Sequence, residues 1–317
     1  MREAIQSRGR LADHPVWARV LASTELSART ILPAIVSSAV EDREQVEGVP
    51  WLERLSLTEV VRQARAASVA GLGGLVLLGA SDRKDEHALL ASEPDHVVPR
   101  AIRAVKEAAP DLAVATDVCV CAYTAHGQCV LFGEKGADVP GTLERLVSIA
   151  LLHAGAGADL LIASGMLEGT VSALRAALAA AGRDEVPVAA LLKLESALEV
   201  TQRSAVQAIS IAERAVQLLP AADAAAAVAR ARRDMAEGAD AVIIQPGAPG
   251  LDIVARLATF ADRPIASYFT ADEHGLFAAA TEGALDSVAA EREHLAAARR
   301  SGASLVISWG AASTTDS

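Results

Sequence analysis

Eight short apolar runs alternate along the chain with longer segments in which apolar residues recur with helical spacing. The intervening segments, such as "LTEVVRQARAASVA" and "GTVSALRAALAAAG", are rich in Ala, Leu, Arg and Glu and have a period near 3.6, so we expect helices there. Several end in Gly, as in "AGAGADLLI" and "AEGADAVII", which is a helix C-terminal signal. The apolar runs predict buried strands that begin near Thr30, Gly73, Leu112, Ala158, Val186, Ala239, Arg263 and Ala303.

Strict alternation of strand and helix predicts a parallel sheet. Eight repeats within about 290 residues favour a closed (β/α)8 TIM barrel over an open doubly wound sheet. We expect residues 29–317 to form this α/β barrel domain and residues 1–28 to form a short N-terminal arm or a leading helix. No linker divides the chain.

Composition and charge narrow the class of protein. The 317 residues are 52% hydrophobic, and no apolar run reaches the roughly 18 to 20 residues of a membrane span. The N-terminus "MREAIQSRGR" is too polar for a signal peptide, which predicts a cytoplasmic globular protein. A net charge of -11 disfavours nucleic acid and anionic membranes as partners, because phosphate binding needs a clustered basic surface. Small molecules or other proteins remain as candidate partners.

The residues with unusual chemistry follow the predicted strands. In a (β/α)8 barrel the loops that leave the C-terminal ends of the strands carry the active site. A loop that holds every cysteine leaves the third strand, Lys193 ends the fifth, Gln245 ends the sixth and Tyr268 lies near the end of the seventh. We therefore expect these residues to meet at one end of the barrel.

The cysteine loop "TDVCVCAYTAHGQC" holds Cys119, Cys121 and Cys129, the three cysteines of the chain. Such crowding is unlike a disulfide framework, which spreads an even number of cysteines along the chain. Three thiolates suit Zn²⁺ with a fourth position open to water or substrate, which is the catalytic arrangement. Two alternatives stay open: His126 completes a closed structural site, or the cysteines are simply small apolar residues.

Lys193 differs from the other three lysines, Lys84, Lys106 and Lys135, which sit in polar surroundings. It closes the apolar run "VPVAALLK", so partial desolvation would lower its pKa and free its amine to attack a carbonyl as a Schiff-base lysine. The alternative is a lysine whose stem packs on the barrel rim.

The long segment after Lys193, residues 194–223, predicts a lid. Within it, Arg203 and Arg214 are candidates to clamp a carboxylate, although two arginines in a helical loop are also compatible with a solvated face.

These motifs resemble the porphobilinogen synthases, also called 5-aminolevulinate dehydratases, from about Arg29 to Ala312. The cysteine loop resembles the family's zinc loop, "IASGMLEGTV" the following strand and turn, "GADAVIIQPGAPGLDI" the family signature and "SYFTADEHGL" the seventh strand loop. The resemblance implies a (β/α)8 barrel, a homo-oligomer between dimer and octamer, and an arm that wraps a neighbouring subunit. It also implies the condensation of two 5-aminolevulinate molecules in an A site and a P site, each with its own imine-forming lysine.

The resemblance carries over the A-site half residue by residue. Lys193 matches the A-site lysine, and the three cysteines match the ligands of a Zn²⁺ cofactor. Arg203 and Arg214 match lid arginines that hold the A-site carboxylate. Gln217 matches a lid glutamine with a spacing one residue short.

The P-site half does not carry over. Gln245 stands where the family has the second lysine, and an amide nitrogen is not a nucleophile. Gly250 and Trp309 stand where the family has tyrosines, Ala271 replaces a serine, and Ala122 replaces a glutamate in the zinc loop. The replaced family residues thus belong mainly to the P site.

Three hypotheses follow for the function. The first is a lyase-type condensing or dehydrating enzyme of specialised metabolism that acts on 5-aminolevulinate or a similar aminoketone acid and has a rebuilt second pocket. The second is a true porphobilinogen synthase of tetrapyrrole biosynthesis. The third is a paralogue without catalytic activity that binds a ligand or joins an oligomer.

Overall fold

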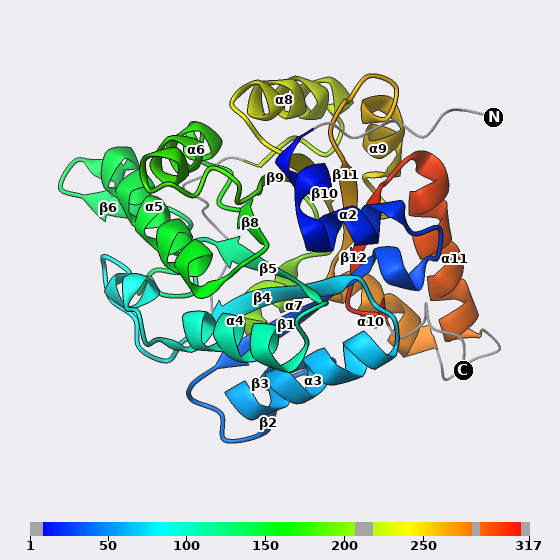
Figure 1. Cartoon of the computed structure of the whole chain (residues 1–317), viewed down its shortest axis with the longest axis horizontal. Coiled ribbons are helices and arrows are strands. Elements are labelled where there is room, and N and C mark those ends of the chain that lie inside the picture. The colour runs from blue at the N-terminus through cyan, green and yellow to red at the C-terminus, as the bar shows by residue number, and fades with distance from the viewer. Residues whose placement is uncertain (1–8, 207–217, 281–285, 312–317) are drawn as a thin grey trace.

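The parallel sheet closes into a barrel. The computed structural model describes residues 9–206, 218–280 and 286–311, apart from the side chains of residues 202–204. Eight parallel strands form a ring in which β12 pairs with β1, which confirms the predicted (β/α)8 barrel (Figure 1). In order around the ring they are β1 (Thr30–Ser37), β4 (Gly74–Ala80), β5 (Ala113–Val118), β8 (Leu160–Ala163), β9 (Val188–Lys193), β10 (Ala241–Gln245), β11 (Ile265–Phe269) and β12 (Leu305–Ser308).

Helices surround the ring of strands (Figure 1). None of the helices in the described ranges is long and apolar enough to cross a membrane. After the N-terminal helices they are α3 (Leu57–Val69), η2 (Leu89–Ser92), α4 (Val97–Ala108), α5 (Val139–Ala156), α6 (Thr170–Ala180), α7 (Val200–Ala205), α8 (Ala224–Ala236), α9 (Leu251–Leu257), α10 (Ala271–Ala280) and α11 (Ser287–Ser301).

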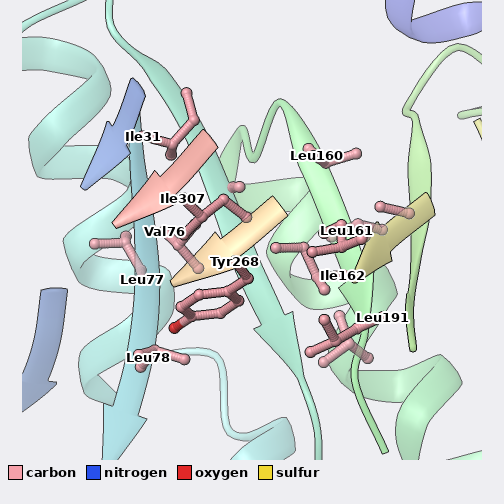
Figure 2. Close-up of a cluster of buried hydrophobic side chains, with 14 of the residues drawn as sticks. Ile31, Val76, Leu77, Leu78, Leu160, Leu161, Ile162, Leu191, Tyr268 and Ile307 are labelled. Atoms are coloured by element: carbon pink, nitrogen blue, oxygen red, sulfur yellow. The ribbon is translucent and has the colours of Figure 1, made fainter. Parts of the chain in front are cut away.

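The barrel strands are buried on both faces, which explains why they read as continuous apolar runs rather than as alternating ones. All residues of β4, β8, β10, β11 and β12 are buried. Figure 2 shows side chains from several strands meeting in one cluster, among them Ile31, Val76, Leu161, Leu191 and Ile307. The barrel interior is therefore a packed core over most of its height.

Capping residues at the helix ends agree with the signals read from the sequence. Asp138 and Asp223 cap α5 and α8 by accepting hydrogen bonds from the backbone N–H of Gly141 and Ala226, each at 3.0 Å. Gly157 ends α5 with φ 101°, a left-handed conformation that glycine adopts without steric cost. Gly238, which follows α8, likewise has a positive φ of 102°, so the glycine signals before the fourth and sixth strands are confirmed.

Two aspartates at the N-terminal end of the barrel join neighbouring strands. Asp159 precedes β8 and accepts the backbone N–H of Val114 in β5 at 2.8 Å. Asp240 precedes β10 and accepts the backbone N–H of Val188 in β9 at 2.9 Å. Both carboxylates are buried, and Asp159 also accepts two hydrogen bonds from Lys106. The Gly-Ala-Asp turns therefore fix strand register at the end opposite the predicted site.

The described part of the N-terminal arm folds onto its own barrel. It contains α1 (Arg10–Asp13), α2 (Pro15–Ala22) and η1 (Ser27–Arg29), and α1 and α2 are dark blue in Figure 1. Trp17 is 1% exposed and donates its indole N–H to the carbonyl of Asp159 at 2.9 Å. Arg10 binds Asp184 at 2.9 Å, ahead of β9. The arm residues thus cover the N-terminal ends of the strands.

Two hairpins add to the predicted elements. The strand β2 (Arg43–Val46) pairs antiparallel with β3 (Val49–Leu55), and β3 joins the edge of β1. The strands β6 (Leu131–Gly133) and β7 (Gly136–Asp138) form a second hairpin after the cysteine loop. The apolar-run criterion misses both, because β2 has a single buried residue and β6 and β7 have three residues each.

Candidate active site

Strand geometry brings the predicted residues to the C-terminal end of the barrel. Side chains two positions apart on a strand face the same side, so the residue that ends a strand lies above an apolar residue of the barrel interior. Lys193 ends β9 and stands above Leu191 in this way, and Ser164, the first residue after β8, lines the same cavity as Ile162. These residues line a cavity of about 50 Å³ together with Val76, Leu78, Asp117, Cys119, Cys121, Glu199, Val206, Gln245 and Tyr268.

Lys193 and Gln245 are direct neighbours across the sheet. Their Cα atoms are register partners in the parallel pair of β9 and β10, and the backbone N–H of Leu194 donates to the carbonyl of Gln245 at 2.8 Å. Lys193 is half-buried, and its backbone N–H lies 3.2 Å from the sulfur of Met166. Gln245 is 3% exposed, and its Oε1 has no hydrogen-bond partner among the described residues. The cavity thus holds an amine and an amide side by side.

Asp117 adds a carboxylate to this pair. Burial raises the pKa of Asp117, while the positive charge of Lys193 acts in the opposite direction. The hydroxyl of Ser164 donates a hydrogen bond to Asp117 Oδ1. The carboxylate is therefore close enough to Lys193 for their charges to interact.

The three cysteines form a compact group. Their sulfur atoms all lie within 4.8 Å of one another, and Cys119 Sγ is 3.4 Å from Cys121 Sγ. Tetrahedral coordination with a metal–sulfur bond near 2.3 Å separates sulfurs by about 3.8 Å. The group therefore fits a metal ion held by three thiolates. The alternative that the cysteines are simply small apolar residues stays a prediction, since Cys119 is buried and Cys121 and Cys129 are half-buried.

His126 lies outside the metal-binding group that the described residues form. Its Nδ1 accepts the backbone N–H of Gln128 at 3.1 Å, and its ring packs edge-on against Phe132 with centroids 4.8 Å apart. These contacts give His126 a role in folding the loop. The alternative of a closed site with His126 as fourth ligand is therefore not supported.

The cysteine loop is tied to the loop that follows β4. The backbone N–H of Asp85 donates to the carbonyl of Tyr123 at 3.1 Å, and the N–H of Ala125 donates to the carbonyl of Asp85 at the same distance. Lys84, for which the sequence indicates polar surroundings, is half-buried near Cys121: burial lowers the pKa of Lys84, and a charge on that thiol raises it.

The remaining predicted residues are not all brought together. Tyr268 lines the cavity and is 3% exposed. Ala271 is fully buried at the start of α10 and Trp309 is half-buried after β12, and neither is among the described residues that line this cavity. Arg203 lies in α7, but its side chain is outside the described part. Arg214 and Gln217 lie outside the described residues altogether.

The ends of the predicted lid are anchored near Lys193. The backbone N–H of Leu219 donates to the carbonyl of Lys193 at 2.9 Å, and that of Glu195 donates to the carbonyl of Leu219 at 2.8 Å. The helix α7 is held by Arg54, which donates to the carbonyl of Ala205 at 2.7 Å.

Sequence reasoning missed two groups that shape the site. Glu199 is 4% exposed and lines the cavity, although it lies in a polar stretch without a local signal. Glu273 of α10 accepts the backbone N–H groups of Gly247, Ala248 and Thr270 at 3.1, 2.7 and 2.6 Å. It thereby joins the loop that follows Gln245 to the loop that follows Tyr268. The stretch "SYFTADEHGL" indicates the family only and assigns no role to this glutamate.

A closed (β/α)8 barrel with a lysine, a carboxylate and a thiol cluster at the C-terminal ends of its strands has the arrangement of an enzyme active site. The family model described as delta-aminolevulinic acid dehydratase matches residues 6–317. The chain belongs to this family, whose members are lyases.

Individual relatives agree with the family match. The delta-aminolevulinic acid dehydratase of Escherichia coli is 31% identical over 98% of this chain and 96% of its own length. That of Streptomyces coelicolor is 33% identical over 95% of this chain and 94% of its own length. A crystal structure of the Toxoplasma gondii enzyme in complex with the reaction product porphobilinogen superposes with a TM-score of 0.86 at 27% identity, over 96% of this chain and 90% of that one.

Proposed function

We propose that this chain is a lyase that forms an imine between Lys193 and 5-aminolevulinate or a similar aminoketone acid, and that its second substrate pocket has been rebuilt. The proposal rests mainly on the position of Gln245: this residue lines the cavity directly beside Lys193. Lys193 is the one lysine that lines this cavity among the described residues. The proposal extends to a different co-substrate, or to a reaction of one aminoketone acid alone.

The imine step uses groups that the cavity contains. The neutral amine of Lys193 attacks the ketone carbon, a carbon–nitrogen bond forms, and the carbonyl oxygen leaves as water after two proton transfers. Asp117 lies close enough to stabilise the positive charge of the protonated imine. An amide at position 245 cannot undergo this step, so we propose a single covalent substrate site.

We propose Zn²⁺ as the metal of the three-thiolate group. Cys119, Cys121 and Cys129 would hold it, since thiolate ligands favour Zn²⁺ and leave a fourth position open. A bound zinc ion supplies Lewis-acid polarisation of a substrate oxygen. The loop contacts through Asp85 and His126 keep the thiols in place for it.

We also propose roles for the remaining predicted residues. Arg203, Arg214 and Gln217 of the lid would hold the substrate carboxylate, and Tyr268 would form the wall of the cavity. Ala271 and Trp309 would shape the second pocket from outside the cavity as it stands. The chain would act on its small-molecule substrate as a homo-oligomer in the cytoplasm, with residues 1–28 as the arm and 29–317 as the catalytic domain.

The second candidate function is that of a true porphobilinogen synthase, which joins two 5-aminolevulinate molecules with loss of two water molecules. The identity to enzymes of that name over nearly the whole chain favours it. It would require catalysis with one imine-forming lysine, because the amide of Gln245 cannot supply a second.

The experiment that separates the two is porphobilinogen formation from 5-aminolevulinate by the purified protein. We expect little or no product from the natural sequence. A rate comparable to that of the Escherichia coli relative, measured side by side, would favour the second candidate. The variant Gln245→Lys adds a control, because a second lysine at this position should add a second borohydride-labelled peptide if the pocket still admits a ketone.

A further inference from the structure

The side chain of Gln245 ends in an amide whose acceptor the described residues leave unused. Gln245 is 3% exposed and lines the cavity beside Lys193. Its carbonyl oxygen Oε1 has no hydrogen-bond partner in the described part of the chain. Buried side-chain acceptors normally receive a hydrogen bond. A ligand in the cavity can supply this donor, because binding sites use a few convergent polar groups to orient what they bind.

The backbone on both sides holds residue 245 in place. On one side, β10 pairs with β9, and the carbonyl of Gln245 accepts the backbone N–H of Leu194 at 2.8 Å. On the other side, the N–H of Gly247 donates to the buried carboxylate of Glu273 at 3.1 Å. The position of Gln245 relative to Lys193 is therefore set by the fold before a ligand enters, which favours selective binding.

An aromatic wall stands on the far side of Gln245 from Lys193. The strand β10 lies between β9, which carries Lys193, and β11, which carries Tyr268. Tyr268 lines the same cavity, and its ring lies among the apolar side chains of the barrel interior (Figure 2). A flat ring of this kind offers apolar surface to a planar group that lies beside the amide.

The charges around Lys193 favour a neutral group next to Gln245. Asp117 interacts electrostatically with Lys193, so it balances the positive charge of a protonated imine. Glu199, which also lines the cavity, takes part in an interaction of its own. A further charge beside the neutral amide of Gln245 would be buried without a counter-ion, which is costly.

We infer that Gln245 binds a neutral planar group with a donor and an acceptor side by side, of which a carboxamide is the simplest, on the ligand that lies beside Lys193. A primary amide carries a C=O acceptor and an N–H donor on neighbouring atoms, so two amides can pair through two hydrogen bonds. A carboxylate has acceptors only and would place negative charge against Oε1, and an ester has no donor for it. The inference rests on the proposed imine at Lys193 and names the chemical class of the second group in the pocket.

The test uses two small ketones, acetoacetamide and methyl acetoacetate, of which only the first has a donor. Neighbouring strands lie about 4.8 Å apart, so an amide close to the ketone carbon that Lys193 attacks is within reach of Gln245. Borohydride reduction and peptide mapping give the concentration of each ketone that half-saturates labelling of Lys193. Imine formation by the same ketones with n-butylamine gives the ratio that reactivity alone produces.

With the natural sequence, the half-saturating concentration of the ester divided by that of the amide should exceed the n-butylamine ratio by at least about tenfold. The reason is that the ester leaves the buried acceptor of Gln245 without a donor. Gln245→Met keeps the length of the side chain and removes both polar ends, so it should bring the ratio to within about threefold of the n-butylamine value.

Gln45→Met supplies the matched control, since Gln45 is exposed on β2 outside the cavity, and it should keep the ratio of the natural sequence. If Gln245→Met does not fold, as judged by thermal unfolding, the comparison of the natural sequence with n-butylamine carries the test. A ratio equal to the n-butylamine value, or a raised ratio that persists in Gln245→Met, overturns the inference while the imine at Lys193 stands. If neither ketone labels Lys193, the proposed function fails, and the inference that rests on it fails with it.

Discussion

The three thiols of the cysteine loop influence one another strongly. Hydrogen bonds with Cys121 and Cys129, together with burial, raise the pKa of Cys119 well above its usual value. A metal ion reverses this preference, because thiolates are the ligands and binding releases their protons. The protonation state of this loop therefore depends on whether its metal is bound.

Purified protein should contain about one Zn²⁺ per chain, and each of the changes Cys119→Ser, Cys121→Ser and Cys129→Ser should lower zinc affinity by at least about tenfold. Elemental analysis and competition with a chromogenic chelator measure both. Removal of the metal should make three thiols available to a thiol reagent. Full zinc content in a Cys→Ser variant would contradict the assignment of that ligand.

Two buried histidines behind the cysteine loop make stability depend on pH. Burial lowers the pKa of His153 to about 3 and that of His96 to about 4, and their rings lie 6.2 Å apart. The unfolded chain binds these protons near pH 6.5, whereas the folded protein binds them only at lower pH. Stability is therefore present above about pH 6.5 and is lost as the pH falls toward 4.

Each histidine should contribute a loss of about 1.4 kcal/mol in the free energy of unfolding per pH unit between pH 6 and 5. Urea unfolding at these two pH values measures the loss. His153→Leu should reduce the dependence of the free energy of unfolding on pH by about that amount, whatever its effect on stability at pH 7. The exposed His294→Leu is the control. If the pH dependence of the free energy of unfolding is unchanged in the His153 variant, protonation of His153 does not cause it.

At the scale of elements, the connections between strands determine where the chemistry lies. Glu273 at the start of α10 receives three backbone hydrogen bonds from the loops after β10 and β11. Burial raises the pKa of Glu273, and these hydrogen bonds act in the opposite direction. One carboxylate thus holds the two loops that flank Gln245 and Tyr268.

Glu273→Gln should destabilise the protein by about 1 to 3 kcal/mol, since the amide nitrogen cannot accept a hydrogen bond and buried N–H groups lose their partner. It should also raise the half-saturating concentration of the ketoacid at Lys193, as the loop beside Gln245 loosens. Chemical unfolding and borohydride trapping measure the two effects. Leu276→Ala, on the exposed side of the same helix, should leave trapping unchanged. Normal trapping in Glu273→Gln would limit its role to stability.

Sequence patterns predicted the elements well and the contacts between them poorly. Eight apolar runs located the eight barrel strands, because strands buried on both faces need no alternation. The hairpin of β2 and β3 was missed since β2 reads "REQV" and is stabilised by pairing with β3 rather than by its own apolar residues. Glu273 was missed because two of its partners, Gly247 and Ala248, lie in the loop after β10, about 25 residues away along the chain.

For the whole molecule, the two ends of the barrel have separate tasks. The N-terminal end is covered by α1 and α2 and joined by Asp159 and Asp240, whereas the C-terminal end carries Lys193 and the cysteines. Mutations at the N-terminal end of the barrel should therefore alter stability, and mutations at the C-terminal end should alter imine formation or metal binding.

Trp17→Ala should lower the free energy of unfolding by about 3 to 5 kcal/mol, because it removes a large buried side chain and its hydrogen bond to Asp159. Arg19→Ala on the exposed side of α2 removes an exposed ion pair with Asp111 and should change stability by less than about 1 kcal/mol. Denaturant unfolding compares the two variants. Equal effects would show that α2 is not packed on the barrel as described.

The central claim is that Lys193 is the single lysine that forms an imine. The most direct measurement is borohydride reduction with 5-aminolevulinate, followed by peptide mapping of the natural sequence, Lys193→Ala and Lys84→Ala. Lys84 is the matched control, since it is half-buried near Cys121 but does not line the cavity among the described residues. The account predicts one labelled peptide, lost in Lys193→Ala and kept in Lys84→Ala. Label that persists in Lys193→Ala, or a second labelled lysine in the natural sequence, would contradict it.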